Sequence, residues 1–423
     1  LYLRGKFMKL FKKAAAILFS CTMLAAAVPF TAAAETKQST EVSKMELKFD
    51  TNGEFKILLL ADTQDTDEPQ KEMLEIINNT LDSENPDLVI FLGDNTCSFA
   101  GATKEKTATA IRKIIEPVAE KNVPFAMVYG NHDHEGLCNE KNKMTEEEAK
   151  EFMLSVYQEF PNCLAIEGEE LTGVGTYNLL IKDSKGKKDI FNLWLMDSNP
   201  YYENGYGFVQ PDQQEWYINT SNKLKKANGG TPLPSLLFQH IAVPEVYQLA
   251  DSSDSPKSGY VHGNTAMFRD KYWKASSKVI QGSFQEGPCP ADVQHDQFNT
   301  WKQQGDVIGA FFGHDHPNDY LGVVDGIYLG AVPAAGYYSY GWNHGARTVT
   351  LHENDLKNFD TEILRADDIL GYKVKPAYKD KHGYAEYKYK FLPGVIGGSV
   401  GAVALIAAAG IITAVVKKKK KSK

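Results

Sequence analysis

The sequence predicts an α/β fold with a partly parallel β-sheet, because short apolar segments alternate with amphipathic helical patterns. Each apolar segment is only four to six residues long and is apolar over most of its length. Segments of this length and composition are typical of strands that are buried on both faces. The five segments are 55–60, 87–92, 124–129, 235–238 and 307–312.

Two helical patterns lie between the first three predicted strands. Residues 68–81 place Met73, Ile76, Ile77 and Leu81 on one face of a helix. Residues 107–121 do the same with Ile111, Ile114, Ile115 and Val118, although Pro117 interrupts the pattern. This strand–helix–strand order predicts βαβ units, which place parallel strands side by side in one sheet.

The first 34 residues have the pattern of a secretory signal peptide. Basic residues occur between positions 4 and 13 without an acid, an apolar run follows at 14–28, and Ala32 and Ala34 form an A-x-A site. We expect cleavage after Ala34. Cys21 fits a lipoprotein signal poorly, because the apolar run continues past it.

The C-terminal end has the pattern of a membrane anchor. Residues 392–416 carry no charge, and at about 1.5 Å per residue a helix of this length spans the ~30 Å hydrocarbon core. Six lysines follow within 417–423, and positive charge stays on the cytoplasmic side. A buried core helix and a cell-wall sorting signal are the alternatives. The sorting signal fits less well because its Thr-Gly is missing after Leu392 and Pro393.

These end segments predict the domain organisation. We expect a signal peptide at 1–34, a single extracellular domain at 35–370, a polar stalk at 371–391, a transmembrane helix at 392–416 and a basic cytoplasmic tail at 417–423. The expected protein is therefore a single-pass cell-membrane protein with its main domain outside the cell. The combination of signal, anchor and lysine tail is typical of Gram-positive bacteria.

Charge and cysteine content narrow the class of protein. Without the five basic residues of the signal peptide and the six of the tail, the chain has 35 Lys and Arg against 54 Asp and Glu, a net charge of −19. Such an acidic body argues against a nucleic-acid partner. Cys97, Cys138, Cys163 and Cys289 are too few for a disulfide scaffold, and the sequence does not choose among their three pairings. The oligomeric state is open.

Polar side chains that can bind metal ions follow each of the five predicted strands. Because sites in open α/β sheets form at the carboxyl ends of the strands, we expect these side chains to lie together. His314 and His316 are two positions apart, so in an extended chain they project to the same side. The seven candidate metal ligands are Asp62, Gln64, Asp94, Asn131, His240, His314 and His316.

The chemistry of these ligands predicts two divalent ions. Structural zinc sites prefer thiolates and have four ligands, whereas a mixture of carboxylate, amide and imidazole suits Mn²⁺, Fe²⁺ or Zn²⁺. Seven ligands are too many for one ion and about right for two. Two-metal sites stabilise both the attacking and the leaving oxygen in a displacement at phosphorus.

In their order along the chain, the five blocks DTQ, GDN, GNHD, QHI and GHDH resemble the pattern of the calcineurin-like metallophosphoesterases. The match spans residues 62–316. Longer stretches at 207–217, 238–245, 313–322 and 345–351 are similar to the purple-acid-phosphatase-like branch. This resemblance implies a two-sheet β-sandwich flanked by helices.

The resemblance also implies a role for each residue. One metal would be bound by Asp62, Gln64, Asp94 and His316, and the other by Asp94, Asn131, His240 and His314. A water activated by the metals would attack phosphorus while His132 protonates the leaving oxygen. Asp133, the next residue, is grouped with His132 as catalytic.

The chain departs from the family pattern at two positions. Gln64 stands where the family has histidine, so we expect its amide oxygen to replace the imidazole or to bind a metal-held water. Cys97 stands where purple acid phosphatases have tyrosine, so we expect neither the purple colour nor an obligatory ferric ion. Outside the motifs, Asp197 and Asn199 are interpreted as a strand-end turn, and Arg347 either binds phosphate or forms a structural ion pair.

Three functions fit these motifs. A metal-dependent phosphomonoesterase is favoured. A phosphodiesterase that acts on nucleotides or lipid head groups uses the same ligands, so the sequence does not separate the two. A cell-surface protein that binds metals without turnover is the third, and the presence of His132 and Asp133 argues against it.

Overall fold

The computed structural model describes residues 45–97, 102–338, 340–374, 378–379 and 385–386. The predicted signal peptide, transmembrane helix and basic tail lie outside the described residues. Within the described part of the chain, no helix is both long enough and apolar enough to cross a membrane. The predicted stalk is described only at 371–374 and in a short antiparallel pair, β18 (Tyr378–Lys379) with β19 (Ala385–Glu386).

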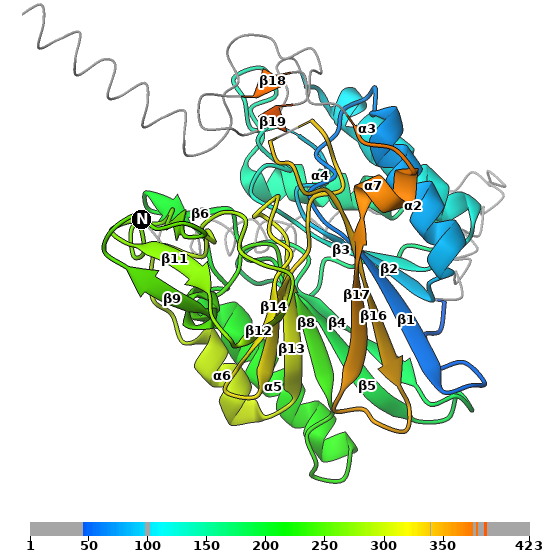
Figure 1. Cartoon of the computed structure of the whole chain (residues 1–423). Helices are drawn as coiled ribbons and strands as arrows, with labels where there is room; N and C mark the ends of the chain where they lie inside the picture. Colours follow the sequence, from blue (N-terminus) through cyan, green and yellow to red (C-terminus); the bar gives the residue numbers. More distant parts are fainter. Residues whose placement is uncertain (1–44, 98–101, 339, 375–377, 380–384, 387–423) are drawn as a thin grey trace, which may run out of the picture. The chain divides into compact units, whose positions relative to one another are not determined.

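Two β-sheets form the framework (Figure 1). The first sheet contains, in spatial order, β17 (Phe359–Arg365), β16 (Gly345–His352), β1 (Glu54–Leu60), β2 (Leu88–Leu92) and β3 (Phe125–Val128). The second contains β12 (Val279–Gln281), β14 (Leu321–Val324), β15 (Ile327–Ala331), β13 (Val307–Phe312), β8 (Ser235–Phe238), β5 (Asp189–Leu195) and β4 (Tyr177–Lys182). All five strands predicted from apolar segments are confirmed to within one residue at each end.

The sheets are partly parallel, as predicted. In the first sheet, β1, β2 and β3 run parallel, whereas β16 and β17 are antiparallel additions. In the second sheet, β13 lies between two parallel partners, β8 and β15, and β5 is parallel to β8. The carboxyl ends of β1, β2 and β3 therefore meet at one edge, and those of β8 and β13 meet at another.

Helices cover the outer faces of the sheets (Figure 1). On the first sheet lie α2 (Lys71–Glu84), α3 (Lys104–Glu120) and α4 (Glu146–Tyr157), and α7 (Ala366–Leu370) packs beside α2. On the second lie α5 (Pro211–Ala227), α6 (Gln297–Gln304) and the 3-10 helix η1 (Pro244–Leu249). All eight predicted apolar residues of α2 and α3 are buried, and Pro117 is accommodated inside α3.

Shorter elements complete the fold. A small three-stranded sheet contains β10 (Val261–His262), β11 (Tyr272–Ala275) and β9 (Ala250–Ser253). A hairpin of β6 (Tyr201–Tyr202) and β7 (Gly205–Tyr206) follows the carboxyl end of β5. Neither element was expected from the sequence.

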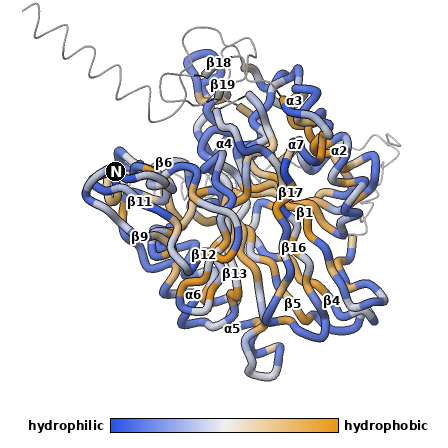
Figure 2. The backbone as a smooth tube through the Cα atoms, in the orientation of Figure 1, coloured by the Kyte–Doolittle hydropathy of each residue, from blue (hydrophilic) through white to orange (hydrophobic). Residues whose placement is uncertain are grey.

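Hydrophobic packing joins the two sheets into the predicted sandwich. One core cluster contains residues of both sheets together with α2, α3 and α4, and Phe311 of β13 packs against Phe359 of β17 with 5.8 Å between ring centroids. The Tyr177 hydroxyl on β4 donates to the Met127 carbonyl on β3 at 2.8 Å. A second cluster lies between the second sheet and α5 and α6. Figure 2 shows hydrophobic residues concentrated in the strands of both sheets.

Candidate metal centre

The candidate site forms where the carboxyl ends of strands from both sheets meet. In the first sheet, the loop after β1 lies beside the loop after β2, because the Asp62 amide donates to the Gly93 carbonyl at 3.1 Å. The second sheet joins them directly, since the His314 amide donates to Asp62 Oδ2 at 2.9 Å. The predicted convergence of the strand ends is therefore present in the structure.

Left-handed backbone conformations occur at four of the seven candidate ligands. Residues with a Cβ rarely adopt a positive φ, and those that do occur in turns and often cluster at functional sites. The chain thus turns sharply at the end of β1, β2 and β13 and directs these side chains to one point. The four residues and their φ angles are Asp62 (49°), Gln64 (37°), Asp94 (48°) and His314 (73°).

Two glycines allow the loops after β2 and β3 to approach each other closely. Gly93 has φ 87°, and a Cβ added to it would lie 2.6 Å from the Gly130 nitrogen. A Cβ on Gly130 would lie 2.1 Å from Asp94 Oδ1. These contacts explain why glycine precedes Asp94 and Asn131, since any larger residue would displace the carboxylate.

Carboxylate and imidazole atoms of the site lie within a few ångströms of each other. His240 Nε2 is 3.3 Å from Asp94 Oδ2 and 4.0 Å from Asp62 Oδ1. His316 Nε2 lies 3.5 Å from Asp62 Oδ1. The ligand atoms of Asp94, His240 and His314 all lie within 4.8 Å of one another, as one ion would require.

Hydrogen bonds from the far nitrogen fix the tautomers of two histidines. His240 Nδ1 is 2.8 Å from the Leu92 carbonyl, and His316 Nδ1 is 3.1 Å from the Tyr340 carbonyl. A carbonyl only accepts, so each Nδ1 carries the hydrogen, and Nε2 is the ring nitrogen left to bind a metal. This arrangement is typical of histidines that bind metals.

Four buried polar atoms of the site have no hydrogen-bond partner among the described residues. Leaving such an atom unsatisfied costs about 1–3 kcal/mol, so four together need a common explanation. Divalent cations would satisfy all four, and the residues present therefore fit the predicted metals. The atoms are Asp62 Oδ1, Asn131 Oδ1, His240 Nε2 and His314 Nε2.

Charge and burial prepare the site for cations. Burial, reinforced by the nearby His240, lowers the pKa of His314 well below its usual range, and burial lowers the pKa of His316 to about 3. Both rings are thus neutral, the form that binds metal. Burial opposes a charge on His240, but Asp94 outweighs it and raises the pKa of His240 to about 10. The same carboxylate attracts a metal cation to this position.

Asn131 and Gln64 present different atoms to the site. Asn131 Nδ2 donates to the Tyr201 hydroxyl at 3.2 Å, so its unpartnered Oδ1 is the atom available to a metal. Gln64 Nε2 donates to Asp94 Oδ2 at 3.0 Å, and its backbone amide donates to the Asp94 carbonyl at 2.9 Å. Gln64 thus contacts the carboxylate predicted to bridge the metals, and its role as a ligand stays a prediction.

His132 lies beside the ligands, and its side chain is partly exposed. Its backbone amide donates to Asp94 Oδ1 at 2.7 Å, and its Nδ1 is 2.9 Å from Glu135 Oε2. Burial opposes a charge on the ring, but Asp94 and Glu135 raise the pKa of His132 to about 9. A protonated imidazole at the edge of the site can donate a proton.

Backbone amides surround the carboxylate of Asp133, the residue grouped with His132 as catalytic. Its carboxylate accepts from the backbone amides of Asn95, Thr96 and Gly130 at 2.8, 3.0 and 2.8 Å, and the residue is only 2 % exposed. Both oxygens therefore bind the loops that carry Asp94 and Asn131. These contacts hold the two loops together, and a catalytic role of Asp133 stays a prediction.

Several residues around the site were not predicted. The Tyr340 ring stacks on His316 with 4.4 Å between centroids, and its hydroxyl donates to the buried Glu286 at 2.9 Å. Tyr206 meets His314 edge-on at 4.4 Å. These contacts join segments that are far apart in the chain, which local sequence patterns do not report.

Hydrogen bonds distinguish between the alternative interpretations of Asp197, Asn199 and Arg347. Asp197 forms a buried ion pair with Lys150 at 2.6 Å and accepts from the Asn199 amide at 2.9 Å, which confirms the strand-end turn. Arg347 is fully buried and donates to Gln281, Thr361 and the carbonyls of residues 319 and 331, so it is structural. The four cysteines of the predicted body are free thiols.

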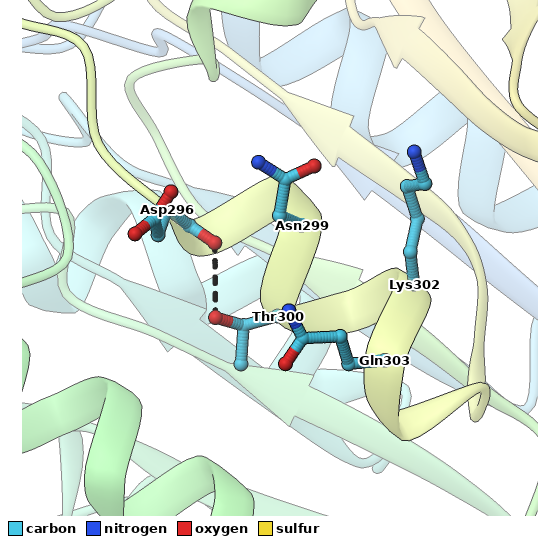
Figure 3. A pocket seen from close by; sticks show the side chains of 5 residues that line it. All are labelled: Asp296, Asn299, Thr300, Lys302 and Gln303. Atoms are coloured by element: carbon cyan, nitrogen blue, oxygen red, sulfur yellow. Dashed lines mark hydrogen bonds between the residues drawn. The ribbon is translucent and has the colours of Figure 1, made fainter.

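A pocket elsewhere on the surface is separate from this centre. Its volume is about 450 Å³, and it is lined by one side of α6 (Figure 3). No candidate ligand lines it, and the Thr300 hydroxyl is bonded to the Asp296 carbonyl at 2.9 Å. Its lining residues are Asp296, Asn299, Thr300, Lys302 and Gln303.

A helix-flanked sandwich with nitrogen and oxygen ligands at the carboxyl ends of its strands defines the class of the metallophosphoesterases. Residues 55–318 match the calcineurin-like phosphoesterase family, and the chain belongs to this family. The resemblance of the five motif blocks is thereby confirmed.

Similar proteins point to the purple-acid-phosphatase-like branch. Probable inactive purple acid phosphatase 14 of Arabidopsis thaliana is 28 % identical over 354 residues, which cover 75 % of this chain and 79 % of that protein. Probable inactive purple acid phosphatase 29 of the same plant is 29 % identical over 349 residues, with 74 % and 80 % covered. A dimetal phosphatase from Danio rerio aligns at 12 % identity and a TM-score of 0.46, covering 79 % of this chain and 99 % of that one.

Proposed function

We propose that this protein hydrolyses phosphate esters with two divalent cations and that phosphomonoesters are its preferred substrates. The observation that carries the proposal is that four buried oxygen and nitrogen atoms without a hydrogen-bond partner among the described residues converge beside His132. Asp62, Gln64, Asp94 and His316 would hold one cation, and Asp94, Asn131, His240 and His314 the other. When bound, the cations would neutralise charge on the phosphoryl oxygens and activate a water molecule.

The protein's own residues perform the remaining tasks. Asp133 fixes the loops that carry Asp94 and Asn131, and the carbonyl partners of His240 and His316 fix their rings. His132 donates a proton to the leaving oxygen of the ester, since its side chain is partly exposed and its Nδ1 is held by Glu135. The mixture of carboxylate, amide and imidazole ligands suits Mn²⁺, Fe²⁺ or Zn²⁺.

A non-catalytic metal-binding role is the second candidate. Two similar plant proteins carry the name probable inactive purple acid phosphatase, and Gln64 replaces the histidine of the family pattern. The site nevertheless keeps six of its seven ligands in the family's form and retains His132. Turnover is therefore the favoured proposal.

A substrate panel separates these functions. The purified chain is assayed on phosphomonoesters and on nucleotide and lipid-type diesters, with Mn²⁺, Fe²⁺ or Zn²⁺ supplied in turn. We expect kcat/KM to be higher for monoesters than for diesters with at least one metal. Preference for diesters would support the phosphodiesterase. Tight metal binding without turnover of any ester would support the non-catalytic role.

Gln64→His is expected to strengthen binding of one cation roughly 10-fold, because imidazole is a better ligand than an amide for borderline metals. The preference for Zn²⁺ over Mn²⁺ should rise in parallel. Calorimetric titration of each metal into both proteins measures the change, and Gln303→His on α6 is the matched control. Identical affinities and metal ranking in all three proteins would show that Gln64 does not contribute to a metal site.

The proposed location is the outer face of a cell membrane, with residues 392–416 as anchor. The proposal is supported by the charge-free run and the six lysines that follow it. Removal of residues 392–423 is expected to move the protein from the membrane fraction to the medium with its activity intact. Retention of the shortened protein in the membrane fraction would contradict the anchor.

A further inference from the structure

The ring of His132 is held by a residue outside the recognised motif blocks. Glu135 lies three positions further along the loop, and its Oε2 is 2.9 Å from His132 Nδ1. An ionised carboxylate only accepts hydrogen bonds, so Nδ1 carries the hydrogen and the opposite ring nitrogen, Nε2, is left to face other groups. The contact thus fixes the orientation of the ring, and it leaves Nε2 as the nitrogen that is turned away from Glu135.

A tyrosine from a distant segment holds this glutamate in turn. The Tyr201 hydroxyl on β6 donates to Glu135 Oε1 at 2.8 Å. The same hydroxyl accepts from Asn131 Nδ2 at 3.2 Å. One phenol group therefore joins a candidate metal ligand to the carboxylate that orients His132.

The β6–β7 hairpin that carries Tyr201 is also fixed at the site through Tyr206, which packs on Tyr201 and contacts two other segments. Tyr201 and Tyr206 stack with 6.3 Å between ring centroids, and Tyr206 also meets the ring of His314. The Tyr206 amide donates to Asp292 Oδ2 at 3.2 Å. Gly205 leaves room for this carboxylate, because a Cβ there would lie 2.3 Å from Asp292 Oδ2.

We propose that Glu135 is a positioning residue for His132 and that Tyr201 fixes Glu135 relative to the metal ligands. The inference rests on the proposed function, in which His132 is the proton donor. Its physical basis is orientation, since a displacement of about 1 Å in a reacting group can cost about 10²-fold in rate. Without Glu135, the imidazole would lose the contact that orients its Nδ1, and Nε2 would be held less well towards the leaving oxygen.

Four variants of the full chain test this proposal. Glu135→Ala removes the acceptor, and Glu135→Gln keeps an amide oxygen that can accept from Nδ1. Tyr201→Phe removes only the hydroxyl. Tyr202→Phe is the matched control, because the neighbouring Tyr202 is on the same strand and packs against Phe208 instead.

The expected result is a loss that depends on the leaving group. Glu135→Ala should lower kcat roughly 10–100-fold on an alkyl phosphate, whose leaving oxygen needs a proton, and less than about 3-fold on 4-nitrophenyl phosphate. Glu135→Gln should restore most of the rate, and Tyr201→Phe should show a smaller loss with the same dependence. KM, metal content and the Tyr202→Phe control should be unchanged. Equal losses on both substrates, or no loss, would overturn the proposal.

A measurement independent of turnover separates this proposal from the proposed function. In ¹⁵N-histidine NMR spectra, the His132 Nδ1 proton should give a hydrogen-bonded signal in the wild type and in Glu135→Gln, and it should be lost in Glu135→Ala. If the wild type hydrolyses no ester, the proposed function fails while this signal still tests the contact. If the signal is the same in Glu135→Ala, the contact is refuted whatever the activity.

Discussion

Removal of divalent metals is expected to abolish ester hydrolysis, and addition of Mn²⁺ or a similar ion is expected to restore it. The reason is the set of four buried polar atoms without a hydrogen-bond partner among the described residues, which divalent cations would satisfy together. The metal-free protein should also unfold more easily. A ligand present at 100 times its Kd stabilises the folded state by about 2.7 kcal/mol per site.

Elemental analysis, activity and thermal unfolding measure this result together. We expect about two ions per chain before chelation, close to none afterwards, and a lower Tm in the metal-free form. Asp94→Asn should reduce the content of both ions, because this carboxylate is assigned to both. Asp251→Asn, on the exposed strand β9, is the matched control. Full activity in a protein without metal would contradict the proposed function.

His132→Ala is expected to lower kcat roughly 10²–10⁴-fold and to leave the metal content unchanged. The imidazole is outside both sets of candidate ligands. The backbone amide of residue 132 would still donate to Asp94 Oδ1, so the substitution keeps this hydrogen bond to the carboxylate. The loss should be smaller for esters with good leaving groups, which depart without a proton.

Steady-state kinetics over a series of aryl and alkyl phosphates measure this dependence. His262→Ala, at an exposed histidine of β10, is the matched control and should behave like the wild type. If His132→Ala loses the same factor on every substrate, His132 has another role than proton donation. If the variant also loses metal, the ligand sets need revision.

The framework and most of the candidate site could be predicted from the sequence because both depend on local patterns. Continuously apolar runs identified the buried strands, and the polar residue after each run identified a strand end. Parallel pairing then requires these ends to meet, as the bond from the His314 amide to Asp62 shows across 252 positions of sequence.

The hydrogen-bond partners of the site could not be predicted in this way. The GNHD block does not reveal that three backbone amides, two of them 37 and 38 positions away, donate to the Asp133 carboxylate. Glu135 and Tyr201 are 66 positions apart, and neither belongs to a motif block. Such contacts depend on the final positions of loops, which hydrophobic periodicity does not report.

The left-handed backbone at four candidate ligands limits how this site can change during evolution. Valine, isoleucine and threonine are strongly disfavoured at positive φ, whereas asparagine, aspartate and histidine are tolerated there. Selection should therefore retain mainly short polar side chains or glycine at the four positions with positive φ, which are Asp62, Gln64, Asp94 and His314. A lineage can exchange one oxygen or nitrogen donor for another at these positions. It can less easily replace the centre with a hydrophobic core, so weakened metal binding should arise through donor exchange. Gln64, if it binds a metal as predicted, would be one such exchange.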